Sequence, residues 1–235
     1  IISKTPLRIS FAGGGTDLKS YYQKGFGAVV STAIDKYIYI TANKKFDDRL
    51  RVGYSKIEVA DDIERIEHNL VREALKTAGV TKGVDIVYMS DMLPAQEASG
   101  LGSSSSLIVG TLNALYALNG EHTSADKLAK EACDIEIEKL ARPIGKQDQY
   151  AAAFGGMNYI QFNKDGSVFV SPIICQPETK AKLKKNLLMF YTGLKSSSTD
   201  NVLSEQNKKT EDNLQYLNQM TALAQKLKSS LEHDD

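Results

Sequence analysis

Apolar and polar residues alternate in two stretches near the N-terminus, at residues 6–11 and 29–43. The second stretch includes Tyr37-Ile38-Tyr39-Ile40-Thr41, whose period of two is typical of a strand with one buried face. Further strands are predicted at 51–59, 84–89, 157–162, 167–174 and 187–192. The strands at 157–162 and 167–174 are joined by Asn163-Lys164-Asp165-Gly166, so we expect them to form a hairpin.

Apolar residues at helical spacing predict helices elsewhere in the chain. The clearest helix is 104–118, where one face carries Leu107, Ile108, Leu112, Leu115 and Leu118. Further helices are predicted at 63–79 and 124–140, and residues 201–235 show the same apolar spacing. The sequence does not indicate which surface this last stretch packs against.

The composition allows one large hydrophobic core or two modest ones, since 42% of the 235 residues are hydrophobic. The 29 residues of Lys and Arg balance the 29 of Asp and Glu, which argues against nucleic acid or an anionic membrane as a partner. No apolar run approaches the roughly 20 residues of a membrane span, and the N-terminus lacks the pattern of a signal peptide. Cys133 and Cys175 stand apart without metal-binding neighbours, so we expect a protein of the reducing cytoplasm.

A loop rich in glycine and serine leads directly into the clearest helix. It begins at Pro94 and contains Gly100-Leu101-Gly102-Ser103-Ser104-Ser105-Ser106. Unpaired backbone N–H groups and the positive end of the helix dipole meet at such a point, and glycine lets an anion approach them. The loop therefore predicts a phosphate site, although it lacks the GxxxxGK[ST] pattern of the common P-loop. An ordinary turn with a serine N-cap is the structural alternative.

One carboxylate falls on an apolar face. In the predicted helix 124–140, Glu136 lies among Leu128, Ala129, Ala132, Ile135 and Leu140, whereas Glu138 points to the polar side. A carboxylate in apolar surroundings needs a partner, because its desolvation costs several kcal/mol. Magnesium next to a phosphate loop and a buried salt bridge to lysine or arginine are the two explanations.

Two aspartates follow loops of small residues. Asp148 lies in Gly145-Lys146-Gln147-Asp148-Gln149 and could accept a proton from a substrate hydroxyl, or it could cap the next helix. Asp17 follows Gly13-Gly14-Gly15-Thr16 and could accept a hydrogen bond from a sugar hydroxyl, or it could form a turn. A phosphate on the substrate could be bound by Lys4, Arg8, Arg142 or Lys146, which could instead line a solvated rim.

Together these motifs resemble the GHMP family of kinases, which includes galactokinases, mevalonate kinases and homoserine kinases. The resemblance rests on the glycines after the first strand, on Gly100-Leu101-Gly102-Ser103-Ser104, and on the pair Glu136 and Asp148. It implies ATP and Mg²⁺ as cofactors, with residues 100–106 at the ATP phosphates. It also implies Ser104 and Glu136 as magnesium ligands, Asp148 as the catalytic aspartate and Asp17 as a sugar contact.

Within the family, residues 4–17 and 145–150, together with Tyr191-Thr192-Gly193, resemble the D-glycero-D-manno-heptose 7-phosphate kinases. This resemblance implies phosphorylation of the anomeric C1 hydroxyl to give a heptose 1,7-bisphosphate. Substrate contacts are expected from Lys4, Arg8, Gly14, Gly15, Thr16, Asp17, Lys146 and Gly193. A kinase for fucose, a hexose or mevalonate, and a non-catalytic protein that binds a sugar phosphate, are the alternatives.

The implied fold is α+β. The resemblance predicts a two-layer domain like the second domain of ribosomal protein S5 over residues 1–180, followed by the beginning of a C-terminal α/β domain over 181–235. Nothing after Tyr191 resembles the third, glycine-rich motif of the family, so we expect that second domain to be present only in part.

Overall fold

The computed structural model describes residues 1–92, 100–190 and 204–233, and the chain is divided into two compact units. Unit 1 consists of Ile1–Arg8, Ile34–Arg142 and Asp148–Phe154. Unit 2 consists of Ile9–Ala33, Pro143–Gln147 and Gly155–Asp235. Strands β1 (Ile2–Ala12) and β2 (Phe26–Lys44) contribute residues to both units, so neither unit is one continuous piece of the chain.

Unit 1 is built on strands in the order β4-β3-β5-β2, with β1 paired to β2. The strands not yet given are β3 (Leu50–Gly53), β4 (Ile57–Ala60) and β5 (Val84–Ser90). β2 and β5 are antiparallel, with Thr41 opposite Val87, whereas β3 and β5 are parallel, with Val52 opposite Ile86. Helix α2 (Asn69–Thr77) lies between β3 and β5 in the chain and supplies the crossover that a parallel pair needs.

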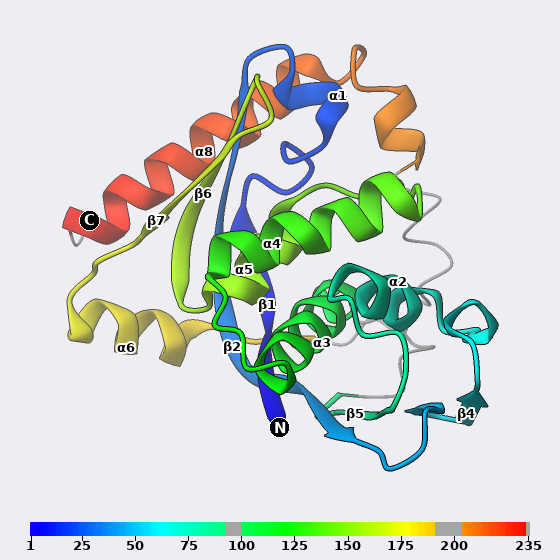
Figure 1. Cartoon of the computed structure of the whole chain (residues 1–235). Coiled ribbons are helices and arrows are strands. Elements are labelled where there is room, and N and C mark those ends of the chain that lie inside the picture. The colour runs from blue at the N-terminus through cyan, green and yellow to red at the C-terminus, as the bar shows by residue number, and fades with distance from the viewer. Residues whose placement is uncertain (93–99, 191–203, 234–235) are drawn as a thin grey trace. The chain divides into compact units, whose positions relative to one another are not determined.

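Helices cover one face of the sheet in unit 1 (Figure 1). Besides α2 they are α3 (Ser103–Leu118), α4 (Ala125–Cys133) and α5 (Gln147–Phe154). The core forms where Ile40 of β2 and Ile86 of β5 meet Leu112 and Leu115 of α3, all of them fully buried. The period-two pattern of the sequence thus places alternate strand residues under the helices, as predicted.

Two predicted elements are divided in the structure. The strand expected at 51–59 is a hairpin of β3 and β4, because the chain reverses direction after Gly53. The helix expected at 63–79 is a 3-10 turn, η1 (Ile63–Arg65), followed by α2. α2 begins only after His68, because its ring nitrogen Nδ1 accepts a hydrogen bond from a backbone N–H in the first turn of α2.

The helix expected at 124–140 changes its winding part-way. It begins as α4, where the Ser124 side chain accepts from Lys127 N–H at 3.2 Å, and continues as the π-helical segment η2 (Asp134–Lys139). The predicted division of its faces is confirmed, since Glu138 is exposed and the opposite side is buried. The buried residues are Leu128, Ala129, Ala132, Cys133, Ile135 and Glu136, whereas Leu140 is only partly buried.

Unit 2 contains the remainder of β2, which pairs antiparallel with β6 (Met157–Asn163). β6 pairs antiparallel with β7 (Val168–Pro172), which confirms the predicted hairpin. Helix α8 (Leu214–His233) lies along this sheet (Figure 1). Its Ala224 and Leu231 form a buried cluster with Ala28, Val30 and Tyr159. This cluster is the packing partner that the sequence did not reveal for residues 201–235.

Unit 2 also contains the helices α1 (Lys19–Tyr22) and α6 (Pro177–Asn186), neither of which was predicted. The strand expected at 187–192 is absent over 187–190, and residues 191 and 192 lie outside the described residues. The domain boundary expected at residue 180 stays a prediction. The two compact units are defined by contacts between Cα atoms, and each of them consists of three segments of the chain. In the described part of the chain, no helix is both long and apolar enough to cross a membrane.

Candidate active site

The glycine loop of unit 1 ends in a left-handed residue at the start of α3. Gly102 is the N-cap of this helix, with φ 76°, and Gly100 has φ 66°. A Cβ atom at Gly102 would lie 3.3 Å from Asp148 Oδ2 and 3.4 Å from Arg8 Cγ, so glycine serves both the backbone angle and the close approach. α3 begins at Ser103, one residue earlier than predicted.

The serine N-cap considered as an alternative is not present, because the N-cap is glycine and makes no side-chain hydrogen bond. The first-turn N–H groups of a helix lack intrahelical partners, and here no capping side chain takes one of them. This arrangement, together with the dipole of the 16-residue helix α3, suits the binding of an anion.

The four serines of the loop divide into two pairs. Ser103 and Ser104 are partly exposed, whereas Ser105 and Ser106 are buried. The Ser106 hydroxyl donates to Pro6 O at 2.8 Å, and the Ser105 hydroxyl donates to Glu136 Oε2 at 2.6 Å. The hydroxyls of Ser105 and Ser106 are therefore used within unit 1, and the Ser104 hydroxyl also hydrogen-bonds to Glu136, although Ser103 and Ser104 are the more exposed residues.

Glu136, in the π-helical segment η2, is fully buried and accepts bonds on both carboxylate oxygens. Oε2 accepts from Ser105 Oγ and from Gln149 Nε2, each at 2.6 Å, and Oε1 accepts from Arg142 Nη1 at 2.7 Å. Burial raises the pKa of Glu136, and this is opposed by the Ser105 hydrogen bond, the charge of Arg142 and hydrogen bonds from Ser104 and Gln149. The salt bridge that the sequence left as one explanation is thus present.

The atoms around Glu136 also fit a hard cation such as Mg²⁺. Carboxylate and hydroxyl oxygens are the ligands that this ion prefers, and both kinds meet where α3 faces Glu136. In addition, Gln149 is fully buried, and its Oε1 has no hydrogen-bond partner among the described residues. The described residues contain no group of three or more His, Cys, Asp or Glu side chains suited to a metal, so serine and phosphate oxygens would have to complete the ligand set.

Asp148 lies in the first turn of α5, where its side chain pairs with Arg8 of β1. Arg8 Nε donates to Asp148 Oδ1 at 2.8 Å, and Arg8 Nη1 donates to Gly100 O at 2.7 Å. Arg8 is 8% exposed, so its guanidinium is held by a carboxylate and the glycine loop rather than standing open to solvent. The structure thus brings together three predicted features of unit 1, namely Arg8, the glycine loop and Asp148.

In unit 2, Asp17 is buried and holds two loops together. Its Oδ1 accepts from Gly15 N–H at 3.2 Å, as in a turn, and its Oδ2 accepts from Gln147 N–H at 3.1 Å. Gln147 is the first residue of α5, so Asp17 also satisfies one of the unpaired N–H groups of this helix. A Cβ atom at Gly145 would lie 1.9 Å from Asp17 Oδ2, which shows how closely the loops pack.

The neighbours of Asp17 differ in their surroundings. Thr16 is fully buried, and its hydroxyl bonds to the backbone of Gly13 and Ala28, so it has a structural use. A Cβ atom at Gly14 would meet nothing within 4 Å, whereas one at Gly15 would lie 2.1 Å from Gln206 Nε2. The glycine with open space beside it is therefore Gly14.

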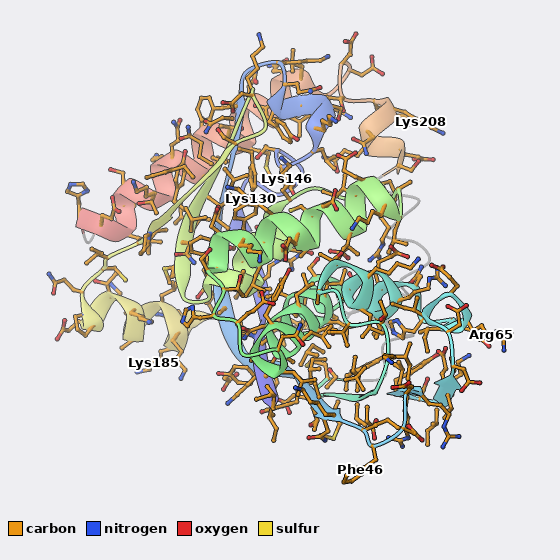
Figure 2. All side chains as sticks on the ribbon, viewed as in Figure 1. Phe46, Arg65, Lys130, Lys146, Lys185 and Lys208 are labelled. Atoms are coloured by element: carbon orange, nitrogen blue, oxygen red, sulfur yellow. The ribbon has the colours of Figure 1, made fainter. Side chains whose placement is uncertain are left out.

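The two lysines predicted to bind the substrate lie in different units and have different contacts. Lys146 of unit 2, which is labelled in Figure 2, donates from Nζ to Gly166 O at 2.7 Å and lies 5.2 Å from the centre of the Tyr22 ring. Lys4 of unit 1 is exposed and lies 3.8 Å from the centre of the Tyr37 ring. Ser3, on the other face of the same strand, bonds to α3, so Lys4 points away from that helix. Gly193 and Pro94 lie outside the described residues.

Residues 55–156 match the family described as GHMP kinases N terminal domain. This segment of the chain is a GHMP kinase N-terminal domain. It contains the glycine loop, Glu136 and Asp148, and Arg8 donates to Asp148 from outside the matched residues. The glycines at 13–15 and Asp17 lie outside the matched residues.

Two curated relatives align with nearly the whole of this chain. The D-glycero-alpha-D-manno-heptose 7-phosphate kinase of Campylobacter jejuni is 29% identical, with 100% of this chain and 72% of that protein aligned. The galactokinase of Pyrococcus furiosus is 30% identical, with 92% of this chain and 60% of that protein aligned. The chain thus spans about three fifths to three quarters of the length of these relatives.

Solved structures share the GHMP kinase fold. A D-glycero-D-manno-heptose 1-phosphate kinase from Bacteroides thetaiotaomicron superposes with a TM-score of 0.83 at 24% identity, covering 99% of this chain and 73% of its own. Phosphomevalonate kinase of Streptococcus pneumoniae, in complex with phosphomevalonate and AMPPNP, has a TM-score of 0.74 at 15% identity, covering 99% and 74%. The predicted family and the predicted α+β fold are confirmed, and the named relatives are phosphotransferases that act on hydroxyl groups.

The contacts of Arg142 and Gln149 were not predicted from the sequence. Arg142 was predicted either to contact a substrate phosphate or to line a solvated rim, and no role was predicted for Gln149, yet both donate hydrogen bonds to Glu136. The signal was available, because a carboxylate predicted on an apolar face needs nearby donors and the loop after its helix supplies an arginine.

Proposed function

We propose that this protein is an ATP-dependent sugar kinase that phosphorylates the C1 hydroxyl of D-glycero-D-manno-heptose 7-phosphate and releases the 1,7-bisphosphate. The observation that carries the proposal lies in unit 1. Asp148 Oδ2 lies 3.3 Å from the Cβ position of Gly102, the N-cap of α3, so a carboxylate faces the point where helix α3 can bind phosphate. Likeness to the Campylobacter heptose 7-phosphate kinase supports the choice of acceptor.

The ATP phosphates would lie against the loop Gly100, Leu101, Gly102, Ser103, Ser104, Ser105 and Ser106. The uncapped N-terminus of α3 offers backbone N–H groups there, and the partly exposed hydroxyls of Ser103 and Ser104 lie beside them. Ser104 and Glu136 would hold Mg²⁺, which neutralises charge on the transferred phosphoryl group. The other contacts of Glu136 fix its carboxylate in one orientation before any ligand arrives.

Asp148 would align the acceptor hydroxyl, or take its proton, as the hydroxyl attacks phosphorus. Arg8 holds Asp148 Oδ1, which leaves Oδ2 directed at the Gly102 side. Phosphoryl transfer depends mainly on positioning and charge, and a carboxylate fixed by two bonds from one guanidinium meets that need.

The loops of unit 2 would bind the sugar phosphate. Gly14 leaves open space beside the backbone, and Asp17 is fixed by two backbone N–H groups next to it. Lys146, whose ammonium group lies over Tyr22, is the cation of this unit that we assign to the 7-phosphate. We assign no substrate contact to Lys4, which is exposed and points away from α3, or to Thr16, whose hydroxyl bonds to the backbone.

The decisive experiment is ADP release by the purified chain with Mg·ATP and one acceptor at a time. The acceptors are heptose 7-phosphate, unphosphorylated heptose, galactose, fucose and mevalonate, and the Asp148→Asn variant is the control for contaminating ATPase. We expect clear preference for heptose 7-phosphate, because a site built for a substrate phosphate rejects analogues that lack it. Phosphorus NMR of the product should show the new phosphate at C1.

Galactose is the second candidate acceptor, because the chain is similar to the Pyrococcus galactokinase. Turnover of galactose would support the assignment as a sugar kinase and contradict the assignment of heptose 7-phosphate as its acceptor. Binding of heptose 7-phosphate without ADP release would instead indicate a non-catalytic protein with this fold.

A further inference from the structure

The two side chains of the Arg142–Glu136 ion pair differ in their exposure to solvent. The Glu136 side chain is fully buried, whereas the Arg142 side chain is 27% exposed, and Nη1 lies 2.7 Å from Oε1. A buried carboxylate is stabilised by such a partner, because removal of the partner leaves a charge without compensation. The arginine, in contrast, can reach water by a movement of its own side chain.

The backbone around the pair has an unusual conformation. Glu136 lies in the π-helical segment η2, and Arg142 N–H donates back to Glu136 O at 3.0 Å. Between them, Ala141 has φ 50°, the one positive φ of a non-glycine residue in the described part of the chain. Left-handed alanine is strained, and such strain persists where the surrounding structure requires it. The strained turn brings Arg142 back onto Glu136.

The two oxygens of Glu136 are held independently of each other. Oε2 is fixed by Ser105 and Gln149, which come from α3 and α5. Oε1 accepts from Arg142, which comes from the loop after η2. Loss of the arginine contact would therefore expose one oxygen to a new partner while the other oxygen keeps the carboxylate in place.

We propose that Arg142 is an exchangeable counter-ion for Glu136, which pairs with the carboxylate in the absence of divalent cation and withdraws when the cation binds. This inference rests on the proposed function, in which Glu136 is a cation ligand. Mg²⁺ binds carboxylate oxygens at about 2.0–2.1 Å. A guanidinium nitrogen 2.7 Å from the same oxygen would then be close to a second positive centre and would be repelled.

The exchange has a measurable consequence for affinity. Since the cation must displace Arg142, the arginine competes with it and weakens its binding. A variant without the arginine charge should bind the cation more tightly, even though it has lost a contact of the site. A purely structural role for Arg142 predicts the opposite, because a loosened site binds its ligand more weakly.

The test uses Mn²⁺ as a paramagnetic substitute, titrated by EPR against the full chain in the presence of a non-hydrolysable ATP analogue. We expect Arg142→Gln to tighten Mn²⁺ binding on the order of tenfold, within the usual range for coupled sites. Arg142→Lys, which keeps the charge, should stay near wild type. Lys139→Gln, which removes an exposed charge from η2, is the matched control and should also stay near wild type.

Glu136→Gln separates this inference from the function on which it rests. If Glu136→Gln leaves Mn²⁺ binding unchanged, Glu136 is not a ligand, and both the metal assignment and the exchange are wrong. If Glu136→Gln weakens binding but Arg142→Gln binds Mn²⁺ equally or less tightly than wild type, the exchange alone is overturned. Circular dichroism of each variant confirms that the titrations compare folded proteins.

Discussion

Arg8 and Asp148 lie 140 positions apart in the chain and form an ion pair in which two guanidinium nitrogens contact one oxygen. Nε donates to Oδ1 at 2.8 Å, and Nη2 lies 2.5 Å from the same atom. The third nitrogen, Nη1, donates to Gly100 O. One side chain therefore joins β1, the glycine loop and the first turn of α5, and it directs Oδ2 of Asp148 toward Gly102.

Replacement of Asp148 tests the proposed catalytic group. Asp148→Asn keeps the size of the side chain but removes the charge that would align or deprotonate the acceptor. We expect kcat to fall by about 10² to 10⁴, whereas the Kd for ATP, measured by calorimetry, should change little because the phosphate loop is intact. Near-normal turnover would remove Asp148 from the mechanism.

Replacement of Arg8 distinguishes positioning of Asp148 from binding of substrate phosphate. In Arg8→Lys one ammonium cannot reproduce the contacts to both Asp148 and Gly100, so Asp148 should lose its fixed orientation. We expect kcat to fall by about tenfold or more, with little change in the KM of the acceptor. A rise in KM confined to phosphorylated acceptors would instead support the phosphate contact predicted from the sequence.

Two glycines of the phosphate loop form a matched pair for substitution. Gly100 and Gly102 are both left-handed, so alanine at either should destabilise the protein by about 1–2 kcal/mol. Only Gly102 approaches Asp148, whereas a Cβ at Gly100 would meet nothing within 4 Å. Thermal melts should therefore show similar losses, while steady-state kinetics should show a larger fall in kcat for Gly102→Ala. Equal kcat values would mean that the Gly102 contact does not affect Asp148.

The sequence predicted helices and strands correctly where a single pattern of apolar residues extends over the whole element. The alternation around Tyr39 placed β2, and the apolar spacing that begins at Leu107 placed α3 within one residue. It failed at 51–59, because a strand pattern does not show that the chain reverses after Gly53. It also did not foresee the π-helical winding of η2, since periodicity alone assumes a uniform helix.

The sequence predicted which residues form the candidate site, but it did not predict which of them contact one another. The motifs identified Asp148, Glu136 and the glycine loop, because their residue types are distinctive. The partner of each carboxylate depends on pairing across long stretches of chain, as between Arg8 and Asp148. Which arginine reaches which carboxylate is a property of the tertiary fold and cannot be obtained from spacing.

Lys146 is the residue through which the acceptor can be tested. If its ammonium binds the 7-phosphate, Lys146→Met should raise the KM for heptose 7-phosphate by about tenfold and leave the KM for ATP unchanged. Lys164→Met, in the exposed turn between β6 and β7, removes the same charge from the same unit and is the control. Equal effects of the two variants would show that only the net charge of unit 2 matters.

The raised pKa of Glu136 predicts how stability depends on pH. Between the ordinary carboxyl pKa near 4.5 and the raised value of the native state, folded protein retains a proton that unfolded protein has released. The free energy of unfolding contributed by this group therefore falls as the pH rises through that range. Glu136→Gln is neutral at every pH, so its melting temperature relative to wild type should increase from pH 4 to pH 7.

Melting curves in EDTA test this directly, and a difference of about 1 kcal/mol would appear as roughly 2–4 °C. Other titrating groups are common to both proteins and cancel in the difference. A Glu136→Gln difference that stays constant with pH would show that the ionised carboxylate is fully compensated by Arg142, Ser105 and Gln149. A relative melting temperature of Glu136→Gln that increases with pH would mean that the buried, ionised carboxylate of Glu136 lowers the stability of the fold. The protein would then keep a destabilising charge at the position where it can bind a cation.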